Sequence, residues 1–307
     1  MTVLSSVPGF ELAGPGEVDY RTSVKLGFER VLRGVYGRGR GLEDLDEWER
    51  RWVGYIRLVQ AVMSVYAGKG AVLFGSTALQ VMGVALPPGL ADWDNVHILV
   101  PHGVSRGDRR GVITHQTRQP LVVWRLVYNL PVLHPVFHWL QLRGATDDQM
   151  IEVGDGLLRN RDPWLTREQM ETELAKCKGL TGAVQARRVF PLVRAGTDSI
   201  RETRVRLILV RAGLPEPVVN HNVYCAGVGI MYSVDLGYEA EKIAVEYDGG
   251  IHATVEQMQK DAQKRRCLQD ERWLVIVVTA ADLRQPNQIV NSVETALVMR
   301  RAAMTPR

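Results

Sequence analysis

Three acidic residues toward the C-terminal end of the chain are spaced for joint chemistry. Asp235 precedes Glu246 by eleven residues, which leaves room for two short strands and a turn, and Asp248 follows Glu246 by two. Residues two apart on a strand point to the same face of a sheet. If Asp235 lies on the neighbouring strand, the three carboxylates converge on one divalent cation. Hard oxygen ligands of this kind favour Mg²⁺ or Mn²⁺ over zinc.

A carboxylate cluster of this kind can bind a catalytic metal ion, but it also concentrates negative charge. Its acids repel one another unless a cation binds or a pKa rises. A bound metal ion activates water and neutralises charge at a phosphate, which phosphodiester cleavage requires. The alternative is that the acids are solvated at strand ends, with Asp248-Gly249 forming an ordinary turn. Glu246 fits that alternative poorly, because it interrupts the apolar run Ile243-Ala244-Val245. We therefore predict a catalytic metal site formed by Asp235, Glu246 and Asp248.

Two further residues are candidates for the same site. His252 lies just after the glycine pair that follows Asp248, where it could position water, contact a phosphate or relay a proton. A loop histidine with a hydrogen-bonding role alone is equally consistent with its position. Glu202 could point into the site from a helix, but its place three residues after Ser199 favours reciprocal helix capping.

Basic residues accompany these acids in the sequence. Residues 187–211 contain seven arginines against two acids, and a second basic set follows at residues 260–272. Such residues can neutralise backbone phosphates and give sequence-independent affinity, although a charge run is often only a solvated helix face. A basic rim around an acidic metal site favours nucleic acid. We predict DNA contacts from Arg201, Arg204, Lys260, Lys264 and Arg265.

The elements that must position these residues follow from capping signals and periodicity. Ser199 to Glu202 and Thr254 to Gln257 have the capping-box form, so helices are expected from there to about residues 212 and 270. Extended segments are expected near residues 218–224, 230–238 and 243–247. The continuous apolar run at residues 274–279 is typical of a strand buried on both faces. This order predicts an α/β sheet flanked by helices.

Composition limits the classes of protein. The 307 residues are enough for two domains with cores of their own, and 46% apolar with 23% charged residues is an ordinary globular profile. The net charge of +4 permits nucleic acid as a partner. The chain has no apolar run of about 18 residues and no signal-peptide pattern, so we expect neither membrane insertion nor export.

The three cysteines indicate the redox environment in which the protein works. Cys177, Cys225 and Cys267 are far apart, odd in number and without zinc-ligand spacing. They argue against a secreted disulfide scaffold and are typical of a reducing compartment. We therefore expect a cytoplasmic protein.

The stretch from about residue 199 to residue 282 resembles the PD-(D/E)xK nuclease superfamily, in the branch of the very-short-patch-repair endonucleases. The matching pieces are, in order, ETRVRLILVRAGLPEPVVN, VDL, AVEYDGGIH and KDAQKRRCLQDERWLVIVVTAADL. The resemblance implies a restriction-endonuclease-like mixed sheet with flanking helices, and metal-dependent DNA cleavage. By position it implies that Asp235 and Glu246 are metal ligands. It places Asp248 where the superfamily usually has lysine, and matches His252 to the branch's histidine.

The sequence departs from many members of that superfamily around the last strand. They have Gly-Trp before the strand and an arginine within it, whereas this chain has Arg272-Trp273 and Val277. The core acids match while these flanking positions differ. The resemblance therefore implies an acidic site more directly than it implies activity.

Residues 25 to 185 more weakly resemble the AbiEi-type antitoxin region that often precedes such nuclease domains. The similar pieces are RVLRGVY, AVLFGSTALQVMGV, NVHILVP, RRGVITH and LPVLHPVFHWL. We therefore expect an α+β N-terminal part before the nuclease-like domain. The predicted division is an arm and helical segment like a degenerate winged helix (1–70), an antitoxin-like α+β domain (71–185) and a nuclease-like domain (186–307). The resemblance associates this layout with defence against phage and other foreign DNA.

Three functions follow, in order of preference. The first is a DNA endonuclease dependent on Mg²⁺ or Mn²⁺. The second is a DNA-binding regulator of antitoxin type that keeps the nuclease fold as an inactive scaffold. The third is a nucleotidyltransferase centred on Gly75-Ser76, which is disfavoured because Asp92 and Asp94 fall in a loop rich in proline and glycine. DNA is the expected partner, and a homodimer is left open.

Overall fold

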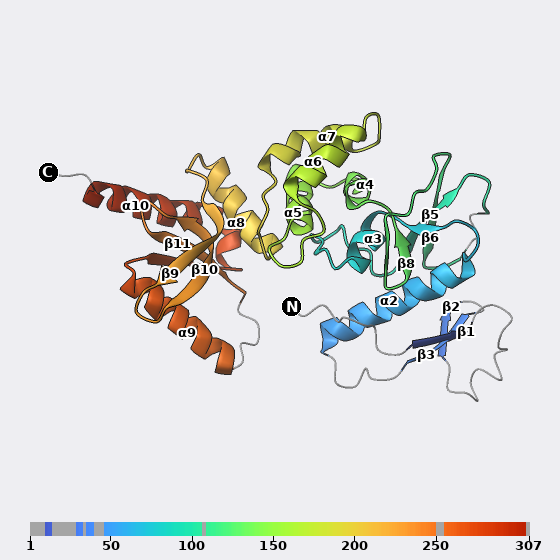
Figure 1. The fold of residues 1–307 in the computed structure, drawn as a ribbon, viewed down its shortest axis with the longest axis horizontal. Helices are drawn as coiled ribbons and strands as arrows, with labels where there is room; N and C mark the ends of the chain where they lie inside the picture. The colour runs from blue at the N-terminus through green and yellow to red at the C-terminus, as the bar shows by residue number, and fades with distance from the viewer. Residues whose placement is uncertain are drawn as a thin grey trace. The chain divides into compact units, whose positions relative to one another are not determined.

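The computed structural model describes residues 10–13, 29–32, 35–39, 46–105, 109–249 and 255–304. The chain forms two compact units (Figure 1). The first comprises residues 1–145 and 173–186, and the second comprises residues 146–172 and 187–307. Both units combine helices with sheets, so the predicted α/β class is confirmed.

The first unit contains the long helix α2 (Glu47–Val65). Its capping box is formed by Asp46 and Glu49, whose side chains accept hydrogen bonds from each other's backbone N–H at 3.1 and 2.7 Å. Trp52 and Ile56, one turn apart, are buried in the main core of this unit, as the helical spacing predicts.

Described strands of the first unit form three groups. The antiparallel order β1-β3-β2 joins β1 (Phe10–Ala13), β2 (Glu29–Leu32) and β3 (Val35–Gly39). The order β4-β5-β6 joins β4 (Val72–Leu73), β5 (Val96–Pro101) and β6 (Val112–Thr117), with the last pair parallel. β7 (Arg125–Val127) and β8 (Leu130–Val132) form an antiparallel pair. The short helices are α3 (Gly75–Val81) and α4 (Pro135–Leu140).

The second unit has a mixed sheet at its centre. Its described strands are β9 (Val218–Cys225), β10 (Ile230–Tyr238), β11 (Ile243–Asp248) and β12 (Leu274–Thr279), in the order β12-β11-β10-β9. β9, β10 and β11 are antiparallel neighbours, whereas β11 and β12 are parallel. The mixed sheet expected for this part of the chain is therefore present.

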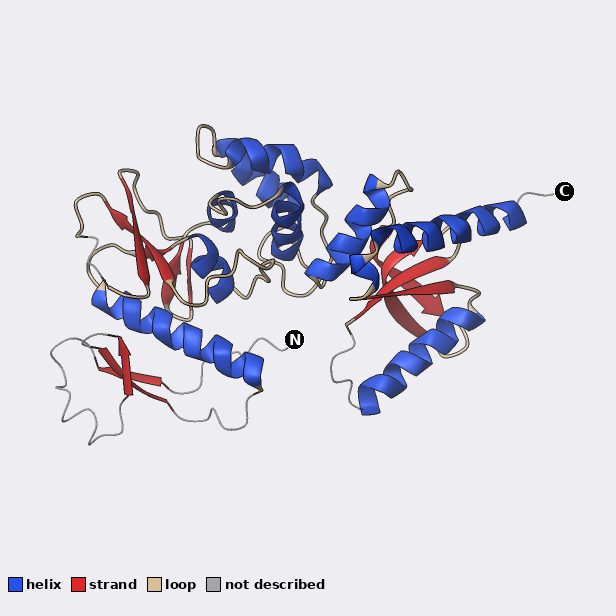
Figure 2. Ribbon diagram, turned by 180° about the vertical axis from the view of Figure 1, so that it is seen from behind, coloured by secondary structure: helices blue, strands red, loops and turns tan. Residues whose placement is uncertain are grey.

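Helices cover both faces of this sheet (Figure 2). On one face, α8 (Ile200–Arg211) and α10 (Pro286–Met304) share a core with the strands that includes Val205, Val245 and Val293. On the other face, α9 (Val255–Asp270) buries Leu268 against Ala244 and neighbouring strand residues. The sheet therefore separates α8 and α10 from α9.

The division of the chain differs from the predicted boundary at residue 186 in one respect. Residues 146–172, which include α5 (Asp147–Leu157) and the start of α6 (Arg167–Lys176), belong to the second unit and not to the middle domain. Thr203 and Arg206 of α8 both donate hydrogen bonds to Asp155 of α5. Such contacts join distant segments, so they have no local signal in the sequence. The helix α7 (Ala183–Val189) spans the boundary, and a short 3₁₀ turn (Phe190–Leu192) follows it in the second unit.

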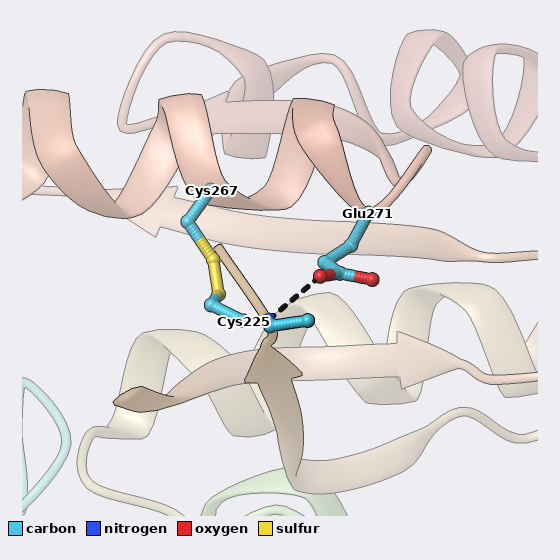
Figure 3. Close-up of a disulfide and its surroundings, with 4 residues drawn as sticks. Cys225, Cys267 and Glu271 are labelled. Carbon is cyan, nitrogen blue, oxygen red and sulfur yellow. Dashed lines mark hydrogen bonds between the residues drawn. A yellow bond between two sulfur atoms is a disulfide. The ribbon is translucent and has the colours of Figure 1, made fainter. Parts of the chain in front are cut away.

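The cysteines are not all reduced, contrary to expectation. Cys225 at the end of β9 and Cys267 of α9 form a disulfide across 42 residues of sequence, with 5.8 Å between their Cα atoms (Figure 3). Cys177 is free and buried. The spacing of the cysteines could not show this pair, because it depends on the end of β9 reaching α9. In the described part of the chain, no helix has the length and apolar character needed to cross a membrane.

Candidate functional site

Asp235 lies within β10, where the sheet is locally irregular. The residues on each side of Asp235 pair with β9, but Asp235 itself is left out of the pairing. Asn220, at the corresponding place on β9, has a positive φ of 50°. On its other side, Asp235 accepts a hydrogen bond at Oδ2 from the backbone N–H of Tyr247, at 2.7 Å. The Asp235 carboxylate is therefore held against β11.

Glu246 comes from β11, beside Asp235. Leu236 pairs with Val245 at the end of the β10–β11 ladder, and Asp235 and Glu246 are the next residues along the two strands. Lys264 of α9 reaches this acid, since its Nζ lies 2.7 Å from both carboxylate oxygens and donates to Oε2. The Glu246 and Lys264 side chains are 22% and 20% exposed. Oε1 of Glu246 is buried and accepts no hydrogen bond of suitable angle from any described residue.

Glu202 approaches the same region from the first turn of α8. Ser199 caps this helix, as predicted, by accepting a hydrogen bond from the Glu202 N–H at 3.2 Å. The Glu202 carboxylate in turn accepts from the Asp198 N–H at 2.9 Å. Glu202 is buried, and burial raises the pKa of its carboxyl group. The Ser199 half of the predicted cap is therefore present, whereas the Glu202 carboxylate bonds the residue before the cap, and its charge also acts on Asp235.

These acids act on one another. Burial, followed by the negative charge of Glu202, raises the pKa of Asp235 to about 7, and Glu246 adds to the rise. The Tyr247 N–H and the positive charge of Lys264 oppose it. A carboxyl group with such a pKa is only about half ionised at neutral pH. Negative charge in the group of Glu202, Asp235 and Glu246 therefore exceeds what Lys264 compensates, a condition that binding of a cation would relieve.

Asp248 does not complete a three-carboxylate set. It is the last residue of β11 and is exposed. Among the described residues, no three side chains of His, Cys, Asp or Glu are grouped so that they could hold a metal ion. Asp248 lies two residues beyond Glu246, at the end of the strand. His252 lies outside the described residues.

The residues predicted to contact DNA fall into different environments. Arg204 is paired with Glu152 of α5, with 2.5 Å between Nε and Oε1, so it serves the packing of α8 on α5. Arg201 is exposed, and its guanidinium carbon lies 5.6 Å from the centre of the Tyr247 ring, close to Asp235 along the sheet. Lys260 and Arg265 are exposed on α9, whereas Lys264 points to the acids.

Lys264 was predicted to contact a DNA phosphate, and its ion pair with Glu246 was not predicted. A signal for the contact existed in the spacing of α9. Lys264 precedes Leu268 by four residues, so both side chains lie on one face of the helix. Because Leu268 is the apolar residue that packs on the sheet, Lys264 must face the sheet as well.

Asp92, which a nucleotidyltransferase site would need as a metal ligand, is engaged within its own loop. Its Oδ1 accepts hydrogen bonds from the N–H groups of Asp94 and Asn95 at 3.1 and 2.9 Å. Its Oδ2 lies 3.1 Å from Nε2 of His97. These contacts favour a structural role for Asp92.

Comparison with known proteins adds relatives without a stated activity. No protein-family model matches the chain, and no solved structure matches it. Two proteins of Mycobacterium tuberculosis, one from strain CDC 1551 and one from strain H37Rv, are each 28% identical to it over 229 residues. The similarity covers 73% of this chain and 80% of each relative. Both relatives are described as uncharacterized, so they support no particular function.

Proposed function

We propose that the second unit is a metal-dependent DNA endonuclease of the PD-(D/E)xK kind. One observation carries the proposal: Lys264 Nζ lies 2.7 Å from both carboxylate oxygens of Glu246, which neighbours Asp235 on the adjacent strand. Two acids on adjacent strands supply oxygen ligands, and the lysine supplies a positive charge beside them. Hydrolysis of a phosphodiester uses both.

The oxygen donors of this site fit Mg²⁺ or Mn²⁺. Mg²⁺ keeps several waters and commonly binds proteins through one or two carboxylates, so Asp235 and Glu246 suffice as ligands. Oε1 of Glu246 retains acceptor capacity, because no described residue gives it a well-directed hydrogen bond. A bound cation supplies charge neutralisation at a phosphate and a water of lowered pKa.

The protein's own residues have separate parts in this proposal. The Tyr247 N–H fixes the Asp235 carboxylate, and the buried Glu202 adds negative charge that favours a cation. Lys264 places its ammonium group where it can donate to a phosphate oxygen and stabilise developing negative charge. The exposed Arg201 is suited to a neighbouring backbone phosphate, and Lys260 and Arg265 extend a basic surface along α9.

The remaining parts of the proposal rest on the sequence. Asp248 and His252 would assist through water or at the phosphate. The resemblance described above suggests defence against phage and other foreign DNA as the biological role, and we propose the cytoplasm as the location in which that DNA would be met.

A cleavage assay tests the proposed reaction. Duplex and single-stranded DNA are incubated with the full-length protein in Mg²⁺, Mn²⁺ or EDTA. We expect metal-dependent nicking that falls by roughly a hundredfold or more in Asp235→Asn and in Glu246→Gln. Glu239→Gln is the matched control, because this exposed acid lies in the turn between β10 and β11. Nicking at the wild-type rate in both site variants would refute the assignment.

A second candidate is a DNA-binding regulator of antitoxin type that uses the nuclease fold as a scaffold. The Glu246–Lys264 ion pair favours it, because that pair neutralises the acid without a metal ion. This candidate predicts salt-sensitive DNA binding, no cleavage with any metal, and little effect of Glu246→Gln on binding.

A further inference from the structure

We propose that Cys225 and Cys267 are a redox-sensitive pair that controls the position of α9 and, through it, of Lys264. The disulfide joins the end of β9 to α9 (Figure 3). Cys267 follows Lys264 by three residues, which is less than one helical turn. The covalent tether is therefore next to the lysine that contacts Glu246. The effect on catalysis rests on the proposed nuclease function, whereas the effect on α9 does not.

Apart from this tether, the part of α9 whose side chains the structure describes has a small apolar anchor. Of its described side chains, at residues 259–270, those of Cys267 and Leu268 are buried and the others are at least partly exposed. The helix α10 is different, since it buries an apolar stripe at Ile289, Val293, Ala296 and Leu297. A helix held by few apolar contacts opens more readily than its neighbours. A cross-link at Cys267 therefore has a large share in fixing α9.

The end of β9 and the turn before β11 also form hydrogen bonds with Glu271, the residue that follows α9. The Ala226 N–H donates to Oε1 of Glu271 at 2.8 Å, and Lys242 Nζ donates to the Glu271 carbonyl at 2.9 Å. Val223 and Leu268 belong to the same apolar cluster. None of these contacts involves the sulfur atoms, so we expect them to remain when the disulfide is reduced. Reduction should therefore loosen α9 without unfolding the unit.

The location of the pair permits exchange with small thiols. Both cysteines are buried, but Cys225 lies between Tyr224 and Ala226, which are exposed at the end of the strand. Local opening of this strand end gives a small molecule access to the sulfur atoms. Exchange is thus coupled to the motion that the disulfide restricts.

The chemistry is thiol–disulfide exchange with a low-molecular-weight disulfide as oxidant. The thiolate of one cysteine attacks the small disulfide, forming a mixed disulfide and releasing one small thiol. The second cysteine thiolate attacks the protein sulfur of the mixed disulfide, which closes the Cys225–Cys267 bond and releases the second small thiol. Two protein thiols are oxidised, and one small disulfide is reduced to two thiols. An excess of small thiol reverses both steps.

Counting thiols gives the first test. The full-length protein is equilibrated with oxidised glutathione or with dithiothreitol, denatured, alkylated and weighed by mass spectrometry. Because the chain has three cysteines and Cys177 is free, we expect one alkylated cysteine after oxidation and three after reduction. Three alkylated cysteines in both samples would overturn the proposal.

Hydrogen exchange gives the second test and is independent of any enzymatic activity. We expect amide exchange in α9 to become about tenfold faster on reduction, while α10 stays unchanged as an internal control. Cys225→Ser should show the fast rate under both conditions, because it cannot form the bond. The reduced wild-type protein provides the same comparison if this variant folds poorly. Equal exchange of α9 in oxidised and reduced wild-type protein would overturn the proposal.

A third test measures whether the Cys225–Cys267 disulfide affects DNA nicking at the proposed metal site. We expect the metal-dependent rate to fall about tenfold on reduction, since small displacements of a positioned group cost activity. Nicking in Cys225→Ser should not respond to the redox condition. If nicking is absent throughout while thiols and exchange respond as expected, the nuclease function fails and the redox pair stands. Equal nicking in the oxidised and reduced wild-type protein would overturn control of the site.

Discussion

The helix α8 contributes to two groups of buried or partly buried acids that differ in how far their negative charge is compensated. Around Asp155, donors surround the carboxylate: the Arg194 N–H at 2.7 Å, Arg206 at 2.8 Å and the Thr203 hydroxyl at 2.9 Å. Around Asp235, the acids Glu202 and Glu246 lie near, and the positive charge of Lys264 opposes the negative charges of Asp235 and Glu246. The same helix thus supports one balanced group and one with surplus negative charge.

The pKa values of Asp155 and Asp235 reflect this difference in charge compensation. Burial raises the pKa of Asp155 to about 6, but the Arg206 charge and the donated hydrogen bonds limit the rise, so the carboxylate is ionised at neutral pH. For Asp235, two neighbouring carboxylates add to the effect of burial and the pKa reaches about 7. A surplus of buried like charge lowers stability and is retained where chemistry uses it. Balance of charge therefore distinguishes acids that hold this fold from acids that are candidates for function.

Substituting asparagine for the two aspartates should give the largest difference between the two acidic groups. Asp155→Asn leaves Arg206 with less compensation inside the unit, and we expect the free energy of unfolding to fall by about 3 kcal/mol. Asp235→Asn removes repulsion, so we expect unchanged or higher stability at pH 8. Urea unfolding of both variants measures the difference. Equal losses in the two variants would show that the acids play the same role.

The pH dependence of the free energy of unfolding gives a second test of the charge surplus around Asp235. The folded-state pKa of Asp235, about 7, lies above its unfolded value of 3.8. Its contribution is therefore fully present below pH 3.8 and is lost as pH rises through 7. Allowing for partial exposure, we expect a loss of roughly 2 kcal/mol between pH 5 and pH 8 in metal-free buffer. In Asp235→Asn this part of the pH dependence should disappear. A wild-type profile that is unchanged by the substitution would contradict the assigned pKa.

Two arginines of α8 provide a smaller and more selective test. Arg201 is exposed near Tyr247, whereas Arg204 is committed to Glu152. We expect Arg201→Ala to weaken DNA binding by about 1 kcal/mol and to reduce its salt dependence by about one ion. Arg204→Ala should lower stability and leave the salt dependence unchanged. Affinity measured by fluorescence anisotropy over a range of salt distinguishes them, and identical salt slopes for both variants would contradict this division.

Much of the fold could be predicted because its signals are local. The capping residue Ser199 marked the start of α8, and the apolar run before Glu246 marked β11, each within about a residue of its observed bounds. Glu246 stood out as a polar interruption of that run. These features require no knowledge of the tertiary structure.

The contacts that distinguish the two acidic groups could not be predicted in the same way. Arg204 and Glu152 are 52 residues apart, and Lys264 and Glu246 are 18 apart. Whether an arginine faces α5 or solvent depends on how the helices pack. The arginine-rich segment therefore looked like a DNA surface as a whole, although Arg204 is used within the unit.

The decisive experiment measures whether Asp235 and Glu246 bind Mn²⁺. Titration calorimetry on the wild-type protein, Asp235→Asn and Glu246→Gln, with Glu239→Gln as control, measures binding without requiring a DNA substrate. We expect one metal ion per chain in the wild type and the control, and a loss of affinity of at least about tenfold in each site variant. Undiminished Mn²⁺ binding in both site variants, or none in the wild type, would contradict the proposed metal site.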